Sequence, residues 1–238
     1  MWANFATSRL ESTLIRDWLR FWRVETTAFE VLNYPMSYLE FIGTVLYLAS
    51  VWLIARRHVW TWPLGIISVV LYMALFYQIR LYADALEQVY FLGASCYGWW
   101  YWNRIPEAEA EPPTVFYSSP SQIIAALMLI AALTLMLTSV LTRVHLWLPS
   151  WFPEAASAPF WDALTTIMSF VAMWLMVQRR VESWLLWIVV DVIGIWLYWV
   201  KDVRFLSLLY VVLLALAING FWSWHQSREQ KNLVPTVA

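Results

Sequence analysis

Cysteine and histidine are scarce in this 238-residue chain, and each shortage narrows what the protein can be. The one cysteine, Cys96, lies inside a hydrophobic run; it allows no intramolecular disulfide and does not reveal the redox compartment. His58, His145 and His225 are scattered at the ends of hydrophobic segments, which argues against a metal cluster. We therefore expect neither a bound metal nor a cofactor.

Charge is scarce too. Only 13% of the residues are charged, against about 25% in a typical globular domain, while 62% are hydrophobic and the mean hydropathy is +0.60. A soluble fold of this size could not hide so much apolar surface, so a lipid environment is the simpler explanation. The net charge of -1 offers no basic field to a nucleic acid. The first 25 residues are too charged to contain the apolar core of a cleavable signal peptide.

Long hydrophobic runs are abundant, and each is close to the length of about 20 residues that a spanning helix needs. Charged or proline-containing stretches separate them, and the glycines fall inside the runs, which predicts close helix packing instead of flexible loops. Seven spanning helices are predicted, at roughly 37–55, 62–79, 85–102, 121–142, 160–177, 184–200 and 205–224.

The stretch before the first run has a different pattern. Between residues 9 and 23, leucine and tryptophan recur every four residues while arginines occupy another face. This pattern predicts an amphipathic helix lying in the membrane interface. The alternative, an eighth span over about 14–34, is disfavoured by three arginines and several acids.

An internal repeat emerges when the chain is compared with itself at an offset of 122 residues without a gap. Arg57 then falls on Arg179 and Trp62 on Trp184, and the segment 97–102 falls on 219–224, which shares its glycine and two of its tryptophans. Hydrophobic matches are common by chance in such chains, whereas gap-free matches of arginine, glycine and tryptophan are not. We infer a duplication.

The duplication dictates a topology. Three helices per unit would leave the second unit inverted, and the extra run between the units restores its direction, so we predict an all-α membrane protein with seven helices in a 3+1+3 parallel repeat of the SWEET type. The predicted parts are an interfacial segment at 1–34, repeat 1 at 35–104, a linker with the central helix at 105–158, repeat 2 at 159–226 and a tail at 227–238. The arginine-rich side, with Arg56, Arg57, Arg179 and Arg180, is expected to face the cytoplasm.

Polar residues at membrane depth identify a candidate substrate site, because such groups usually face a cavity or a partner. The sixth run carries most of them on one helical face. The candidate binding residues are Trp184, Trp187, Asp191 and Tyr198, together with Gln88, Tyr210, Asn219 and Trp62 from other runs. Each has a structural alternative: Trp184 suits an aromatic belt, Asp191 a buried hydrogen bond, and Tyr210 a bridge between helices.

These motifs resemble those of PnuC-type vitamin transporters. The resemblance rests on Trp184-x-x-Trp187-x-x-x-Asp191 with Tyr198, Tyr210 and Gly220-x-Trp222 in the second half, and on Leu81-Tyr82-Ala83-Asp84, Gln88 and Tyr97-Gly98 in the first. It covers about 37–224. It implies a nicotinamide riboside carrier of bacterial inner membranes with a SWEET-like fold, assembled as a homotrimer, whose cargo a cytoplasmic kinase traps by phosphorylation. Relatives that carry thiamine or riboflavin leave the vitamin open.

The candidate residues suit that substrate. Tryptophan can stack on a pyridinium cation, with an attraction of roughly 0.5–2 kcal/mol, while Asp191 can balance its charge. Gln88 and Asn219 can bind the carboxamide or ribose. Two other classes are weaker: an intramembrane enzyme lacks a deep histidine and Cys96 has no obvious base, and a non-transporting receptor would bind ligand without flux. We therefore predict facilitated diffusion by alternating access, and no enzyme activity.

Overall fold

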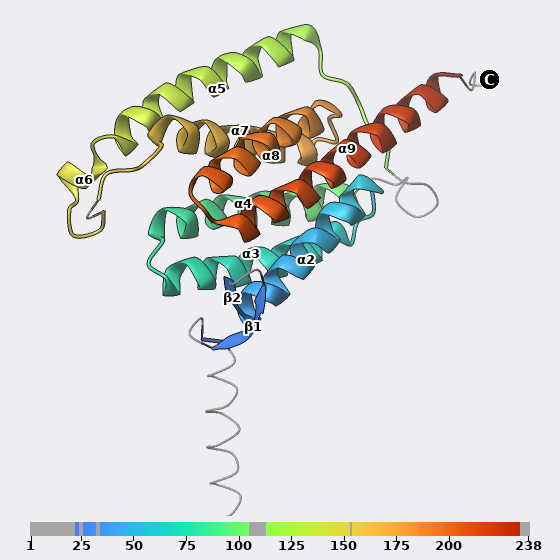
Figure 1. Cartoon of the computed structure of the whole chain (residues 1–238). Helices are drawn as coiled ribbons and strands as arrows, with labels where there is room; N and C mark the ends of the chain where they lie inside the picture. Colours follow the sequence, from blue (N-terminus) through green and yellow to red (C-terminus); the bar gives the residue numbers. More distant parts are fainter. Residues whose placement is uncertain (1–21, 24–25, 32–33, 105–112, 153, 234–238) are drawn as a thin grey trace, which may run out of the picture.

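The computed structural model describes residues 22–23, 26–31, 34–104, 113–152 and 154–233, and within them the chain is almost entirely helical (Figure 1). An antiparallel hairpin of β1 (Thr27–Val31) and β2 (Tyr34–Ser37) precedes the first described helix. The helices are α2 (Tyr38–Ala55), α3 (Thr61–Gln78), α4 (Tyr82–Asn103), α5 (Pro120–Leu141), α6 (Val144–Trp147), α7 (Pro159–Val177), α8 (Glu182–Val200) and α9 (Arg204–Leu233). Residues 9–21 of the predicted interfacial helix lie outside the described residues.

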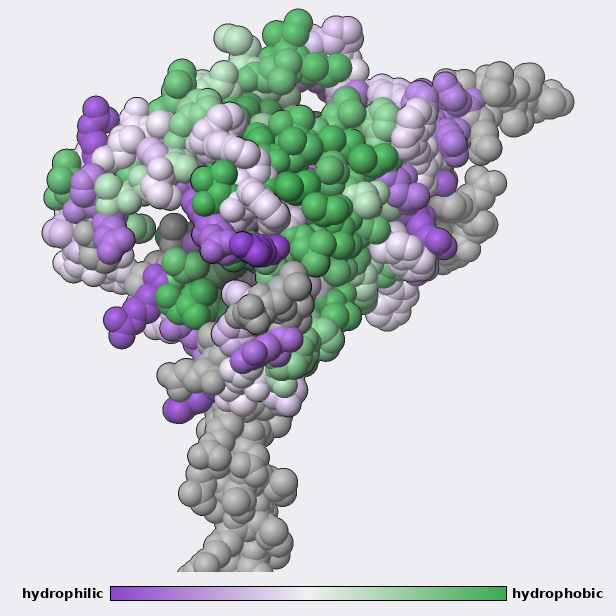
Figure 2. All heavy atoms as spheres, in the orientation of Figure 1, coloured by the Kyte–Doolittle hydropathy of each residue, from purple (hydrophilic) through white to green (hydrophobic). Residues whose placement is uncertain are grey.

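Each of the seven predicted runs corresponds to a long helix. Six of these are long and apolar enough to cross a membrane, and α4 falls short because Glu87, Gln88 and several tyrosines and tryptophans lower its hydropathy. Figure 2 shows the consequence on one face of the molecule: a broad hydrophobic band lies between hydrophilic margins at the two ends of the helices. A multi-pass membrane protein has this distribution of side chains.

Four helices end in the same type of turn. The residue that follows the C-cap of α2, α3, α7 and α8 has a left-handed backbone, with φ between 57° and 63°; these residues are Arg57, Arg80, Arg179 and Asp202. In each turn the next N–H reaches back to a carbonyl in the last turn, as His58 N does to Leu53 O at 3.0 Å. Arg57 and Arg179, like Arg80 and Asp202, are repeat counterparts, so the duplication extends to the backbone of the turns.

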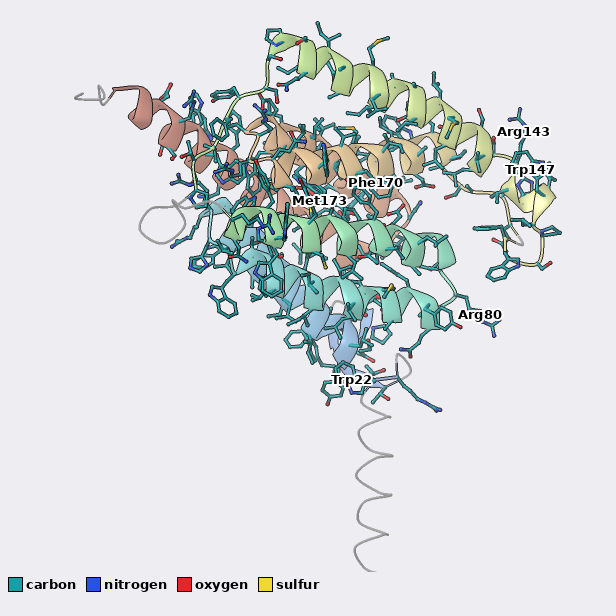
Figure 3. The ribbon with its side chains drawn as sticks, turned by 180° about the vertical axis from the view of Figure 1, so that it is seen from behind. Trp22, Arg80, Arg143, Trp147, Phe170 and Met173 are labelled. Atoms are coloured by element: carbon teal, nitrogen blue, oxygen red, sulfur yellow. The ribbon has the colours of Figure 1, made fainter. Side chains whose placement is uncertain are left out.

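The two units meet along two seams. Within each unit the helices pack in chain order, and between the units α4 packs on α7 while α9 packs on α2. Figure 3 shows Phe170 and Met173 on the part of α7 that faces α4, where Tyr90 donates to the Phe170 carbonyl at 2.7 Å. The remaining long helix, α5, lies outside this arrangement and packs on α7.

A reciprocal pair of hydrogen bonds joins the units at the end where the arginines lie. Trp102 Nε1 of α4 donates to Val177 O at the end of α7, at 2.9 Å. Trp224 Nε1 of α9 donates to Ile54 O at the end of α2, at 3.0 Å. The C-terminal ends of α2, α4, α7 and α9 are therefore at the same end, and the two units have the same orientation. We call this pair the tryptophan bridges.

Glycines let the helices of each unit approach closely. A Cβ on Gly98 would lie 2.4 Å from the ring of Trp62, and a Cβ on Gly220 would lie 2.5 Å from the ring of Trp184. Both rings also meet a second tryptophan edge-on, Trp102 at 5.3 Å and Trp224 at 5.5 Å. The sequence expectation that glycine marks close packing is confirmed at these sites.

Three features were not foreseen from the sequence. The hairpin β1–β2 crosses the predicted boundary between the interfacial segment and repeat 1, and α6 forms a short turn of helix after α5. The last helix continues to Leu233, beyond the end of the hydrophobic run at 224, because polar residues can extend a helix past the apolar segment.

Candidate functional site

Asp191 is a buried residue of α8 near the seam between α2 and α9. Its side chain is in the middle of α8 and the residue is only 4% exposed. Tyr47 of α2 and Tyr210 of α9 both lie within electrostatic range of this carboxylate. Among the described residues it has neither a hydrogen-bond donor nor a cation. A buried carboxylate without a partner is costly, so its surroundings are suited to a ligand that brings a donor or a positive charge.

Tyrosines form the wall beside this carboxylate. The ring of Tyr210 packs directly on Gly194, where a Cβ would lie 2.5 Å away, so the glycine creates the space that the ring occupies. Tyr198 stacks on Tyr210 with centroids 5.4 Å apart and planes 20° apart. Tyr198 and Tyr210 are thus brought together, and Tyr210 lies within electrostatic range of Asp191.

Unit 1 adds two more tyrosines. Thr44 Oγ1 lies 2.7 Å from the hydroxyl of Tyr72 and donates to Glu40 O at 2.8 Å, which fixes Tyr72 against α2. Tyr47 meets the ring of Tyr72 edge-on at 6.5 Å. The seam is therefore lined by aromatic rings that carry hydroxyl groups, which suits a flat ligand with polar substituents.

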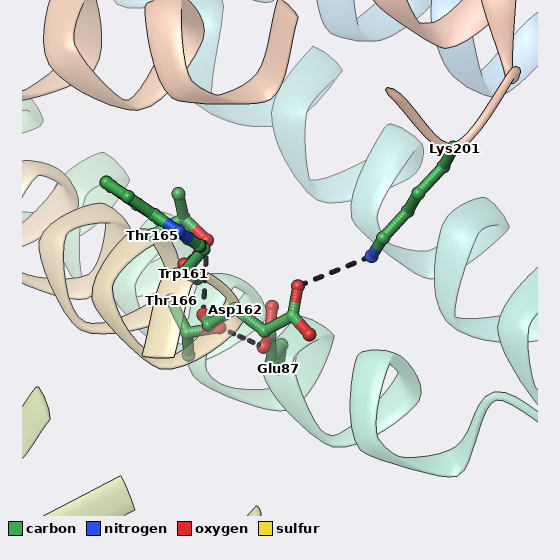
Figure 4. Close-up of polar contacts among 6 residues, drawn as sticks. All are labelled: Glu87, Trp161, Asp162, Thr165, Thr166 and Lys201. Carbon is green, nitrogen blue, oxygen red and sulfur yellow. Dashed lines mark hydrogen bonds and ion pairs between the residues drawn. The ribbon is translucent and has the colours of Figure 1, made fainter. Parts of the chain in front are cut away.

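A second polar group connects α4 with α7 (Figure 4). Thr166 Oγ1 donates to Glu87 Oε1 at 2.7 Å, across the seam. Nearby, Lys201 Nζ lies 3.6 Å from Asp162 Oδ1, in an ion pair that joins the turn after α8 to the start of α7. Glu87 is also within electrostatic range of Asp84 and Asp162, so the outer part of this seam is acidic.

The hairpin covers the other seam at the same end. Tyr34 stacks on Phe205 of α9, with centroids 5.1 Å apart, and its hydroxyl donates to Glu40 Oε1 of α2 at 2.8 Å. Burial, helped by the carboxylate, raises the pKa of the Tyr34 hydroxyl and keeps it a donor. In Figure 3, Arg80 and Trp147 mark this end of the molecule, opposite the tryptophan bridges.

Two of the tryptophans expected at the site have their rings enclosed by protein. Trp184 is 1% exposed and Trp62 is 2% exposed, and each ring packs on the glycine of its own unit. The indole N–H of each is buried without a hydrogen-bond partner in the described part of the chain. In this conformation their rings stabilise the bundle, and a ligand could reach them only after the helices move.

The other expected residues are placed differently. Trp187 is partly buried one turn before Asp191 and packs against the buried residues that join α5, α7 and α8. Gln88 is half-buried on α4, and Asn219 is exposed on α9. The structure does not bring these last two together with Asp191.

Sequence reasoning did not select Glu87, Tyr47 or Tyr72 for the binding site. Nothing in the sequence singled out Tyr72 as a binding residue, because its hydrophobic run contains no charged residue. On α4 the sequence analysis selected Gln88 and overlooked its neighbour Glu87. Across the described residues, no three histidine, cysteine, aspartate or glutamate side chains are arranged to hold a metal ion.

Comparisons with known proteins agree with this architecture. Residues 37–226 match the family model described as nicotinamide mononucleotide transporter. The chain is 33% identical to the nicotinamide riboside transporter PnuC of Escherichia coli K12, over 84% of this chain and 90% of that protein. It is 25% identical to the riboflavin/roseoflavin transporter RibM of Streptomyces davaonensis, over 84% of this chain and 91% of the relative.

A solved structure shares the fold. The crystal structure of the vitamin B3 transporter PnuC superposes with a TM-score of 0.62, covering 81% of this chain and 83% of that chain at 24% identity. At that identity, the match shows a shared arrangement of the helices and does not identify the ligand.

Proposed function

Since the chain belongs to the nicotinamide mononucleotide transporter family, we propose that it carries nicotinamide riboside across a bacterial inner membrane. The relatives named above support a vitamin as the cargo. Nicotinamide riboside combines a flat pyridinium cation with a carboxamide and a ribose, so it needs a counter-charge, an aromatic surface and hydroxyl partners. The seam supplies groups of each kind.

The observation that carries the proposal is the unpaired carboxylate of Asp191 among the hydroxyls of Tyr47 and Tyr210. In the proposed complex Asp191 neutralises the pyridinium charge, and the two tyrosines bind ribose or carboxamide oxygens. Trp187, one turn away on the same helix, stacks on the ring. Gln88 and Asn219 are proposed ligands in a conformation where the seam is open.

The proposed mechanism is facilitated diffusion by alternating access. The two units rock about Asp191, and the tryptophan bridges must break for the seam to open at the arginine end. Net uptake then requires a cytoplasmic kinase that phosphorylates the nucleoside and prevents its return. We further propose a homotrimer, as the family resemblance implies.

A flux assay tests the carrier function. In reconstituted vesicles, labelled nicotinamide riboside should equilibrate without ATP and without an ion gradient. Accumulation that depends on a proton gradient would refute facilitated diffusion, and saturable binding without flux would indicate a receptor. The Asp191→Asn variant should bind at least about tenfold more weakly, because it loses the attraction between the carboxylate and the pyridinium charge, and a close charge pair contributes about 1.5 kcal/mol or more.

The Asp202→Asn variant is a matched control. It removes the same charge from an exposed turn, so its binding should equal that of the wild type. Equal binding by Asp191→Asn would place the site elsewhere.

Riboflavin is the main alternative cargo, because RibM is similar over most of the chain. Riboflavin is uncharged and does not need a buried counter-charge, whereas thiamine is a cation and would suit Asp191. A titration against all three vitamins, followed by tryptophan fluorescence, distinguishes them. Tighter binding of riboflavin than of nicotinamide riboside would overturn the proposed cargo.

A further inference from the structure

A pocket of about 360 Å³ lies between the ends of α4 and α7, away from the Asp191 site. Its wall is mostly aromatic, and its polar side chains come from the end of α7 and the turn that follows. The residues that carry the argument are Tyr97, Tyr101, Phe116, Trp174, Gln178 and Arg180.

The aromatic wall lies near the C-terminal ends of two long hydrophobic helices, where we expect the membrane interface. Apart from Phe116, its rings belong to the last two turns of α4 and the last turn of α7. Tyr97 stacks on Trp174 with centroids 5.7 Å apart and planes 15° apart, and Trp174 is 45% exposed. Exposed aromatic rings at this depth are typical of contacts with the membrane interface.

Two arginines that form no ion pair within the described residues adjoin this wall, although the carboxylate of Glu182 lies nearby and accepts from Ser118. Arg180 donates from Nη1 to Tyr117 O at 2.8 Å, and no carboxylate pairs with it in the described ranges. Arg179 is 6% exposed, and its Nε and Nη1 are buried with no hydrogen-bond partner in those ranges. Its guanidinium lies 5.8 Å from the ring of Tyr101 and 5.2 Å from that of Phe116. Two adjacent guanidinium groups, one buried, favour an anion at this place.

The chain segment that closes the pocket is firmly held. Phe116 N donates to Arg179 O, and Val181 N donates to Phe116 O, each at 3.0 Å. The neighbouring Val115 is 1% exposed, in the core between the two units. Phe116 is therefore a fixed part of the wall, and the pocket is built by the fold.

We propose that this pocket binds one anionic phospholipid. The phosphate accepts from Arg180 and Gln178, close to the buried charge of Arg179. The glycerol and the first part of an acyl chain lie against Tyr97 and Trp174. A lipid is favoured over a soluble phosphate because the pocket combines these cations with aromatic rings at the end of hydrophobic helices.

The duplication provides a natural control. At the other seam, the counterparts of Tyr97 and Tyr101 are Asn219 and Ser223, so the aromatic wall is missing there. That seam still has an arginine stacked on a tryptophan, with Arg56 lying 4.1 Å from the ring of Trp52. The Arg56→Gln variant thus removes the same charge at the same depth without touching the pocket.

The test adds lipids back to delipidated protein and counts bound lipids by native mass spectrometry. Phosphatidylglycerol should bind the wild type at one site more tightly than phosphatidylcholine. Arg180→Gln should weaken that binding about fivefold, since one arginine near the surface attracts an anionic lipid by roughly that factor. Trp174→Leu should also weaken it, and Arg56→Gln should remain within twofold of the wild type.

Three outcomes would overturn the proposal. One is unchanged phosphatidylglycerol binding by both Arg180→Gln and Trp174→Leu. Another is equal affinity for phosphatidylcholine. The third is displacement of the lipid by an equal concentration of glycerol 3-phosphate, which would identify a site for a soluble phosphate instead. Each variant's elution profile confirms that it is folded.

Discussion

Adding one methyl group to Gly98 should destabilise the bundle, although alanine is the better helix former. The new Cβ would lie 2.4 Å from two carbon atoms of Trp62, about 1 Å inside ordinary contact distance. The indole cannot simply move aside, because it is 2% exposed and packs edge-on against Trp102. The clash is therefore transmitted to the core between the two units.

The magnitude follows from two opposing effects. Overpacking of a close-packed interior costs about 1–3 kcal/mol, whereas replacing glycine by alanine in a helix gains up to about 1 kcal/mol. Gly98→Ala should therefore lower the free energy of unfolding by a net of up to about 2 kcal/mol. Gly93 offers the matched control on the same helix, because a Cβ there would meet nothing within 4 Å. Gly93→Ala should raise stability.

Thermal unfolding in detergent, followed by size-exclusion chromatography, measures both changes. The midpoint should fall for Gly98→Ala and rise for Gly93→Ala. A smaller ring should relieve the clash, so adding Trp62→Phe to Gly98→Ala should destabilise less than the sum of the two single changes. Equal midpoints for the two alanine variants would refute the role assigned to Gly98.

Three further changes test other parts of the structure. Arg80→Gly should raise the free energy of unfolding by about 1 kcal/mol, measured by the same melting assay, because φ is 63° there and glycine adopts that conformation without strain. Trp102→Phe should lower it by about 1–3 kcal/mol, since Val177 O loses its donor; an unchanged midpoint would contradict the bridging role. Glu87→Gln retains an acceptor for Thr166 but loses a charge, so it should weaken binding of the nicotinamide riboside cation roughly tenfold and leave the uncharged dihydro form unaffected in a fluorescence titration.

The helices and the duplication could be predicted from the sequence because both rest on local patterns. The run at 37–55 became α2 (Tyr38–Ala55), and the run at 184–200 became α8 (Glu182–Val200). The match of Arg57 with Arg179 reflects a shared turn with nearly the same φ. The length and hydropathy of a run identify a spanning helix. Because the two repeats align without a gap, their turns fall at equivalent positions.

Side-chain roles within the helices were harder to predict. Trp184 shares a helical face with Trp187 and Asp191, so periodicity alone suggested that all three meet a ligand. The decisive neighbour is Gly220, more than 30 residues away in sequence, which provides the surface for the indole. Residues on one helical face can still point toward different neighbours. The helix that packs against them decides which of them face the seam.

The same limit explains Glu87. On α4 the stripe through Gln88 and the stripe through Glu87 are about 100° apart, and both contain polar residues. Thr166 of α7 lies opposite Glu87 and donates a hydrogen bond to it. Gln88 makes no comparable contact within the described ranges. Tertiary contact, which single-sequence patterns do not contain, selected between them.

Two carboxylates within the helices do not follow the duplication, whereas Glu40 and Asp162, near the helix starts, are counterparts. The repeat counterpart of Asp191 is Val69, and that of Glu87 is Leu209, so each unit carries one membrane-depth carboxylate where the other has an aliphatic side chain. The packing residues, in contrast, do follow the duplication: Trp62 and Gly98 recur as Trp184 and Gly220 with the same contacts. A ligand with a cationic ring at one end and a sugar at the other has no two-fold symmetry, and a symmetric site would bind it in two competing orientations. The symmetric tryptophan–glycine packing thus gives the two units matching helix contacts, while the asymmetric acids would give the proposed ligand a single orientation.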